Sequence, residues 1–283
     1  MLISPLTKSK QPVSSLWNKK MSLRPILASL IFVAGASLPS SAKILLENMV
    51  IVPAGFYEPF FLARTPDNKV PSANRKILVP AFMMDVTPVT NDQYLDYVGD
   101  HPEWQKSRVK EIFSDANYLR HWTGDLALPA PEFANQPVTN VSWFAAQAYC
   151  ETIGKTLPTT EQWEFALADE GRDRDAVDQK SFIWMSKPNT AELSDIGLMK
   201  SNGYGISDLV GLVWEWTYDF DSFMTGTELR NTDGKDGAQF CGNGSIGVKD
   251  AKDYPAFMRY SLRTSLHADF TANSVGFRCA RKL

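Results

Sequence analysis

Apolar residues recur at helical spacing in the segment that follows Thr90. Tyr97 and Val98 come three and four positions after Tyr94. In a helix these side chains share one side, as the buried face of an amphipathic helix requires. The pattern therefore predicts a short helix that begins near Thr90 or Asn91 and packs on that face.

A second helical segment covers residues 143–153, between two residues that favour helix ends. Ser142 precedes it and can accept a hydrogen bond as the N-cap. Gly154 follows it, and glycine is the residue most often found just past a helix C-terminus. A third helix should begin at Thr159, because Gln162 stands three positions later as the partner of a capping box.

The third helix is also amphipathic in sequence. We expect Trp163 and either Phe165 or Ala166 to face the core, with Glu161 and Glu164 facing solvent. Beyond it, regular periodicity fades and loops dominate the chain.

Long connections separate the predicted elements in the second half of the sequence. Turn-rich segments cover residues 169–178, 187–201 and 225–247. There is no internal repeat of the lengths that define solenoids or propellers. Connections of this length in a compact domain usually carry function, or are held in place by metals or disulfides.

The N-terminal segment has the composition of a secretory signal peptide. Basic residues precede residue 25, an apolar run covers residues 25–38, and small residues at 40–42 form a cleavage site. We therefore assign residues 1–42 to a signal peptide, with Met21 a possible true start, and residues 43–283 to a single domain. A retained N-terminal anchor is the alternative, although the apolar run is short for a membrane span.

Loss of the leader makes the chain clearly acidic. Residues 1–42 contain five basic and no acidic residues, so the net charge changes from −3 to −8. An acidic domain without a cluster of lysines or arginines in its sequence is a poor candidate for binding nucleic acid or anionic membranes. We therefore expect a periplasmic or secreted protein with no stable membrane association and no nucleic-acid partner.

Three cysteines stand at positions 150, 241 and 279. In an exported chain two of them should form a disulfide and one should remain. The residues alone leave the pairing open.

Polar residues before an apolar strand suggest a site for a hard cation. Asp208 and Glu215 can offer carboxylate oxygens, and the turn at Gly211 and Val213 can offer carbonyls. Calcium takes ligands of this kind. The alternative is a core strand, anchored by its tryptophans, in which Glu215 forms a salt bridge.

Residues 202–216 resemble the Asn-x-x-Gly-Leu-x-Asp-Met-x-Gly-Asn-Val-Trp-Glu-Trp signature of the formylglycine-generating enzyme (sulfatase-modifying factor) family. Further blocks resemble that family in the same order, at residues 49–55, 86–94, 137–143, 148–150, 154–164 and 275–280. The resemblance implies an α+β fold, distantly like C-type lectins, with little regular secondary structure and bound structural calcium. It also implies a disulfide between Cys150 and Cys279, which leaves Cys241 as the odd thiol.

The chain departs from the family where the chemistry of sulfatase activation is expected. The family places two copper-binding cysteines between a Gly-Gly-Ser block, matched by residues 243–245, and an Arg-x-x-x-Arg pair, matched by Arg259 and Arg263. Here the intervening residues 246–258 contain no cysteine. Copper(I) selects soft thiolate ligands. The usual route to formylglycine is therefore disfavoured, and the sequence leaves open whether any redox metal binds.

Four residues are candidates for a functional cleft: Cys241, Arg259, His267 and Asp219. An unpaired cysteine in a glycine-rich loop can be reactive, although a buried inert thiol is the commoner case. Arg259 could bind a carboxylate or phosphate or could pin a loop, and the two readings have equal weight.

The chain most resembles the exported PvdO branch of the family, which matures pyoverdine-type siderophore peptides. This implies a periplasmic maturation enzyme or accessory protein that oxidises or otherwise modifies an exported siderophore-like peptide or protein. The alternative is a noncatalytic, calcium-stabilised module that binds a ligand or another protein. Formylglycine generation is a third and weaker possibility.

Overall fold

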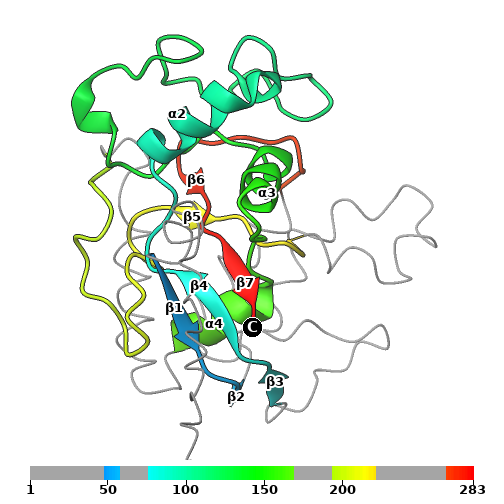
Figure 1. Ribbon diagram of the computed structural model, residues 1–283, viewed down its shortest axis with the longest axis vertical. Helices are drawn as coiled ribbons and strands as arrows, with labels where there is room; N and C mark the ends of the chain where they lie inside the picture. Colours follow the sequence, from blue (N-terminus) through cyan, green and yellow to red (C-terminus); the bar gives the residue numbers. More distant parts are fainter. Residues whose placement is uncertain (1–47, 58–75, 169–192, 221–265) are drawn as a thin grey trace, which may run out of the picture. The chain divides into compact units, whose positions relative to one another are not determined.

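The structure is a computed structural model, and it describes residues 48–57, 76–168, 193–220 and 266–283 (Figure 1). The predicted signal peptide lies outside these residues. Within the described part of the chain, no helix has both the length and the apolar character needed to cross a membrane.

The strands are short and antiparallel pairing dominates. Strands β1, β4 and β7 form a three-stranded sheet in that order, β2 and β3 form a hairpin, and β5 pairs with β6 in parallel. Their bounds are Met49–Val52 (β1), Gly55–Tyr57 (β2), Ile77–Val79 (β3), Phe82–Asp85 (β4), Trp214–Glu215 (β5), Val275–Gly276 (β6) and Ala280–Lys282 (β7).

Two of these pairings continue one another as a single ribbon. Val52 pairs with Phe82 at the end of the β1–β4 ladder, and Gly55 pairs with Val79 at the start of the β2–β3 ladder. Two residues separate the ladders on each side, and a proline is among them on both. Proline has no N–H to donate, so the ladder is interrupted there while its register is kept.

The helices are α2 (Asn91–Asp100), α3 (Trp143–Thr152) and α4 (Thr160–Ala168), with short 3₁₀ turns η1 (Pro102–Trp104) and η2 (Pro131–Phe133). The predicted starts of the three helices are confirmed. Thr90 and Gln93 form a capping box at α2, the Ser142 hydroxyl accepts from the Ala145 N–H at α3, and Thr159 and Gln162 cap α4 reciprocally.

One expectation about α4 is wrong. Glu161 is exposed as predicted, but Glu164 is buried together with Trp163, Phe165 and Ala166. The helix therefore contacts protein on a wider face than the sequence indicated, because core residues pack on more than one side of it. The predicted end of α3 is confirmed, since Gly154 has a positive φ of 68° just past the helix.

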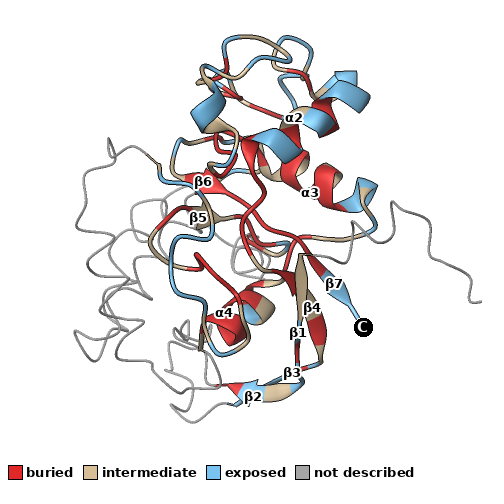
Figure 2. Ribbon diagram, turned by 60° about the vertical axis from the view of Figure 1, so that its left-hand side comes forward, coloured by how far each residue is buried: buried red, intermediate tan, exposed pale blue. Residues whose placement is uncertain are grey.

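Two hydrophobic clusters organise the described residues (Figure 2). The first gathers aromatic side chains of α2 and α3 around Tyr94 and Phe277. The second lies between the β-ribbon and α4, where the Phe165 ring sits so close under Gly55 that a Cβ there would come within 2.7 Å of it. The arrangement is α+β with little regular secondary structure, as predicted.

Candidate functional site

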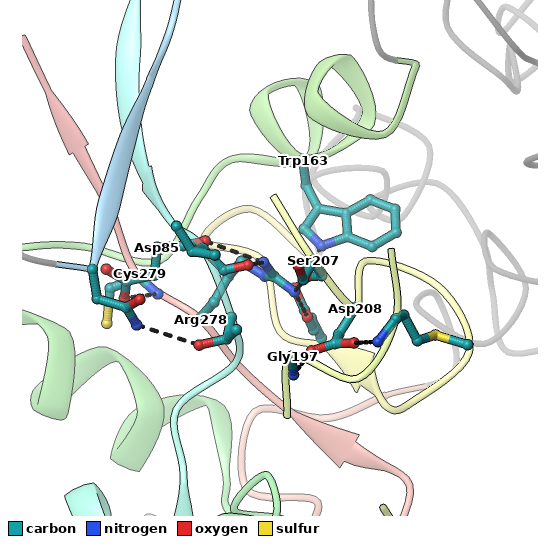
Figure 3. Close-up of polar contacts among 12 residues, drawn as sticks. Asp85, Trp163, Gly197, Ser207, Asp208, Arg278 and Cys279 are labelled. Carbon is teal, nitrogen blue, oxygen red and sulfur yellow. Dashed lines mark hydrogen bonds and ion pairs between the residues drawn. The ribbon is translucent and has the colours of Figure 1, made fainter. Parts of the chain in front are cut away.

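A buried arginine, Arg278, joins the end of β4 to the turn at Ser207 and to β5 (Figure 3). Its Nε and Nη2 donate to the two carboxylate oxygens of Glu215 at 2.8 and 2.7 Å. Its Nη1 donates to the carbonyls of Asp85 and Val86, and Nη2 also donates to the carbonyl of Ser207. A guanidinium has five N–H donors, so every donor of Arg278 has an acceptor.

The side chain of Glu215 is fully enclosed by this network. Its side chain and that of Arg278 have no solvent exposure, and its Oε2 also accepts a hydrogen bond from the Trp163 indole at 2.7 Å. The bidentate pair is the geometry in which an arginine and a carboxylate interact most strongly. The sequence left open a salt bridge at Glu215, and the structure contains one.

A second buried ion pair lies beside the first. Lys155 contacts the Asp85 carboxylate at 2.6 Å, and both side chains are less than a tenth exposed. The other oxygen of Asp85 accepts from the Cys279 N–H at 3.0 Å. Burial raises the pKa of the Asp85 carboxyl above its usual value, because the loss of hydration outweighs the attraction of Lys155 and the hydrogen bond from Cys279.

Cys150 and Cys279 form a disulfide with an S–S distance of 2.03 Å. This is the pair that the family resemblance implied. It joins α3 to the segment before β7 across 129 positions of sequence, and both cysteines are fully buried. We refer to Arg278, Glu215, Asp85, Lys155 and this disulfide together as the buried polar node.

The side chain of Asp208 holds the turn before β5, and the backbone of this residue has an unusual conformation. Asp208 has a positive φ of 61° and is buried. Its Oδ2 accepts a hydrogen bond from the Gly197 N–H, and its Oδ1 accepts one from the Met199 N–H at 3.3 Å. Gly211 has a φ of 105°, and a Cβ there would meet the Met199 side chain. Asp208 thus fixes the loop that leads into β5.

The calcium ligands predicted at Asp208, Gly211, Val213 and Glu215 can be examined against these contacts. A carboxylate has about four acceptor positions. Protein donors fill three on Glu215 and two on Asp208, so each could still give one oxygen to a cation. A calcium ion that takes one oxygen from each would cross-link the turn to β5. Calcium at this set stays a prediction.

Of the four predicted cleft residues, the structure describes Asp219 and His267. Cys241 and Arg259 lie outside the described residues. Asp219 Oδ1 accepts a hydrogen bond from the Thr160 N–H at 2.6 Å, so it satisfies one of the free donors at the start of α4. His267 is exposed, and its carbonyl accepts from the Phe270 N–H.

Trp143 holds the two segments that carry Asp219 and His267. Its backbone N–H donates to the Ala268 carbonyl, and its indole donates to the Thr217 carbonyl, both at 3.0 Å. Its ring also packs on Phe220, with 6.0 Å between the ring centroids. The described segment that ends at Phe220 and the one that begins at Leu266 are therefore both fixed to the first turn of α3.

Within the described ranges, no group of three or more histidine, cysteine, aspartate or glutamate residues could hold a metal ion. This finding does not test the predicted calcium set, because two of its four ligands, at Gly211 and Val213, would be backbone carbonyls. Sequence reasoning missed the pairing of Asp85 with Lys155, which no local pattern signals, because the two residues are 70 positions apart.

Comparison with known proteins places the chain in a family. The family model described as the sulfatase-modifying factor enzyme 1-like domain matches residues 35–283. The chain therefore belongs to this family, the class of the formylglycine-generating enzymes, and the resemblance seen in the sequence is confirmed.

Individual relatives differ in length and in activity. A serine/threonine-protein kinase, pkn1 of Chlamydia pneumoniae, is 34% identical over 149 residues, which cover 51% of this chain and only 24% of the kinase. The inactive C-alpha-formylglycine-generating enzyme 2 of Bos taurus is 27% identical over 309 residues, covering 92% of this chain and 96% of that protein. Among solved structures, PvdO from Pseudomonas aeruginosa matches with a TM-score of 0.41 and 19% identity, over 83% of this chain and 94% of PvdO.

Proposed function

We propose that the protein modifies an exported peptide or protein, in the manner of a PvdO-like maturation enzyme or accessory protein of the periplasm. Membership of a family of modifying enzymes supports a role in modification. The absence of cysteine from residues 246–258 argues against formylglycine generation by two thiolates. The leader sequence supports export.

The observation that carries the site is the attachment of two segments to Trp143. The segment that ends at Phe220 and the segment that begins at Leu266 are both fixed on the first turn of α3. Asp219 and His267 belong to these segments, and Cys241 and Arg259 belong to the sequence between them. A substrate cleft at this place would include Asp219 and His267, and Cys241 and Arg259 remain candidates from the sequence alone.

Asp219 needs separate treatment in any test, because it caps α4. Replacement of an N-terminal capping carboxylate by alanine costs about 1 kcal/mol of stability, whether or not the residue takes part in chemistry. His267 is exposed and does not have this structural role among the described contacts. Cys241→Ser and His267→Gln are therefore the informative variants.

The test is a comparison of exported peptides by mass spectrometry. Cells that lack the gene, cells with the wild-type gene and cells with Cys241→Ser or His267→Gln are grown in parallel. We expect an unmodified peptide to accumulate without the gene and at least one of the two variants to fail to restore the product. His101→Gln is the matched control and should restore it, since His101 packs on Tyr97 of α2. Identical peptide masses in all strains would refute the proposal.

A noncatalytic binding module is the second candidate. The similarity to a relative named as inactive, over nearly the full length of both chains, favours it. In that case Cys241→Ser should leave ligand or partner capture unchanged, and no peptide mass should depend on the gene. Formylglycine generation is tested apart from both, by trapping an aldehyde on a cysteine-containing sulfatase-type peptide, and we expect none.

A further inference from the structure

The segment that carries His267 folds into a tight turn. The Phe270 N–H donates to the His267 carbonyl at 3.0 Å, which closes a β-turn with Ala268 and Asp269 at its corners. The first and fourth residues of a β-turn have Cα atoms within about 7 Å of each other. His267 and Phe270 are therefore neighbours, and both are exposed.

Asp115 holds this turn from another loop by three hydrogen bonds. Its backbone N–H donates to the Asp269 carbonyl at 2.8 Å. Its carboxylate accepts from the Thr271 hydroxyl at 2.6 Å and from the Thr271 N–H at 3.1 Å. Thr271 is buried, whereas His267 is exposed. The contacts with Asp115 are thus made on the protected side of the segment.

Asp115 is itself fixed to the hydrophobic core. Its Oδ1 also accepts from the Asn117 N–H at 2.9 Å, and its carbonyl accepts from the Tyr118 N–H at 3.2 Å. Tyr118 is buried in the first cluster, where its hydroxyl lies 2.7 Å from that of Tyr94. The position of the carboxylate is therefore set by packed residues that do not belong to the turn.

The neighbouring attachments of the segment are contacts between backbone groups. The Trp143 N–H donates to the Ala268 carbonyl at 3.0 Å, and the Asn140 N–H donates to the Ala272 carbonyl at 2.9 Å. Substitution of a side chain leaves such groups in place. The carboxylate of Asp115 can be changed alone, so its contribution to the turn can be measured while the segment stays attached.

We propose that Asp115 is a positioning residue for His267 and that it acts through Thr271. This inference rests on the proposed function, in which His267 contacts the exported peptide. A functional side chain needs supporting hydrogen bonds that keep it close to its productive geometry, and a misplacement of about 1 Å can cost about a hundredfold in rate. Asp115 provides such support from beneath the turn, through charge-assisted hydrogen bonds that are stronger than neutral ones.

The test uses the unmodified peptide that accumulates in cells without the gene. Extracts of cells that express each variant convert this peptide, and mass spectrometry gives the initial rate per amount of protein. Thr271→Val removes one donor. Asp115→Asn puts an NH₂ group opposite a donor in either orientation, because both oxygens of Asp115 accept. We expect each to lower kcat about tenfold to a hundredfold with little change in KM, whereas Thr271→Ser, which keeps the hydroxyl, should retain the wild-type rate.

Backbone hydrogen exchange measures the same contacts without the reaction. In Asp115→Asn the N–H groups of Phe270 and Thr271 should exchange about tenfold faster or more, the effect of losing a hydrogen bond to a charged group. Thermal unfolding of each variant, run beside it, gives the fraction that is folded at the assay temperature.

Asp125 and Ser107 provide matched controls. The carboxylate of Asp125 accepts from the Ser107 N–H at 2.7 Å and from its hydroxyl at 2.6 Å, which is the same pair of contacts that Asp115 makes with Thr271. Asp125→Asn and Ser107→Ala therefore remove an equivalent attachment elsewhere. Both should leave kcat and the exchange of residues 267–271 unchanged.

The outcomes separate this inference from the proposed function. If no extract converts the peptide, the wild type included, the proposed function fails and the inference fails with it. If the wild type converts the peptide and His267→Gln does so equally well, only the inference fails. It is also overturned if Asp115→Asn and Thr271→Val match the two controls, if Thr271→Ser loses the rate, or if the losses only follow the unfolded fraction.

Discussion

The buried polar node and the ribbon face invert the usual distribution of residues. The node places Arg278, Glu215, Asp85 and Lys155 in the interior, where charges are costly. The outer face of the β2–β3 hairpin, which we call the ribbon face, places Phe56 and Leu78 in water. In the node each charge has a partner of opposite sign at 2.6 to 2.7 Å, whereas Phe56 and Leu78 are each more than half exposed.

The comparison separates two reasons for keeping an unfavourable residue. A buried ion pair costs hydration, and this cost is offset only while both partners and their hydrogen bonds are present. The node must therefore fail when one member is removed. An exposed apolar residue contributes little to folding, so the ribbon can change without harm to the fold. If function depends on the ribbon face, substitutions there should reduce function and leave stability nearly unchanged.

Removal of Arg278 should have the largest effect. Arg278→Met leaves Glu215 as a buried carboxylate without its cation, and we expect a loss of about 3–5 kcal/mol in the free energy of unfolding. Urea denaturation measures it. The double variant Arg278→Met with Glu215→Leu removes both charges and should recover part of the loss. If the single and double variants are equally unstable, the pair is not what holds this region together.

The helix caps and the node show what a sequence can and cannot predict. The caps at Ser142 and Thr159 were predictable because a cap joins residues three positions apart, whereas the helix start near Thr90 was predicted from apolar spacing. The structure has a cap contact at each of the three. The node joins Arg278 to Asp85 across 193 positions. Such pairing is decided by the whole fold, so local spacing carried no sign of it, and only family resemblance indicated the disulfide.

The candidate site shows the same limit, because the long-range contacts of its residues could not be predicted from local sequence. Asp219 and His267 were candidates from the sequence, but the attachment of their segments to Trp143 follows from long-range contacts. The capping role of Asp219 was not foreseen, because its partner Thr160 is 59 positions away. Residue types were thus predictable, while their partners were not.

The predicted calcium site provides the next test, because its ligands Asp208 and Glu215 lie in or beside the buried polar node. If Asp208 is a ligand, calcium at a hundredfold excess over its dissociation constant should add about 2.7 kcal/mol to stability, and Asp208→Ala should abolish that gain. Glu215→Gln should destabilise the protein in chelator as well, because Arg278 loses its counter-charge, and should also remove the gain from calcium if Glu215 is a ligand. Thermal unfolding in both buffers distinguishes the two. Equal losses for Asp208→Ala in calcium and chelator would make Asp208 a purely structural residue.

The protonation of Asp85 should give a smaller effect that depends on pH. Its folded-state pKa is raised by burial, so the folded protein holds this proton more tightly than the unfolded chain, whose carboxyl titrates near pH 3.9. The stabilising contribution of the proton is complete below that pH and is lost as the pH rises through the folded-state pKa. Wild type should therefore gain stability relative to Asp85→Asn as the pH falls from 7 toward 4. The opposite trend in urea denaturation would mean that Lys155 and the Cys279 N–H hold the carboxylate charged.

Substitutions on the ribbon face should have the smallest effect on stability. Phe56→Ser and Leu78→Ser remove side chains that are 64% and 56% exposed, and substitutions at such positions usually change the free energy of unfolding by no more than about 0.5 kcal/mol. Val79→Ser is the matched control on the same hairpin, because Val79 is 2% exposed and belongs to the cluster beneath the ribbon, and it should cost several times as much. Equal losses at Phe56 and Val79 would show that both faces of the hairpin are packed. The outer face would then be part of the protein interior, and the contrast with the buried polar node would no longer hold.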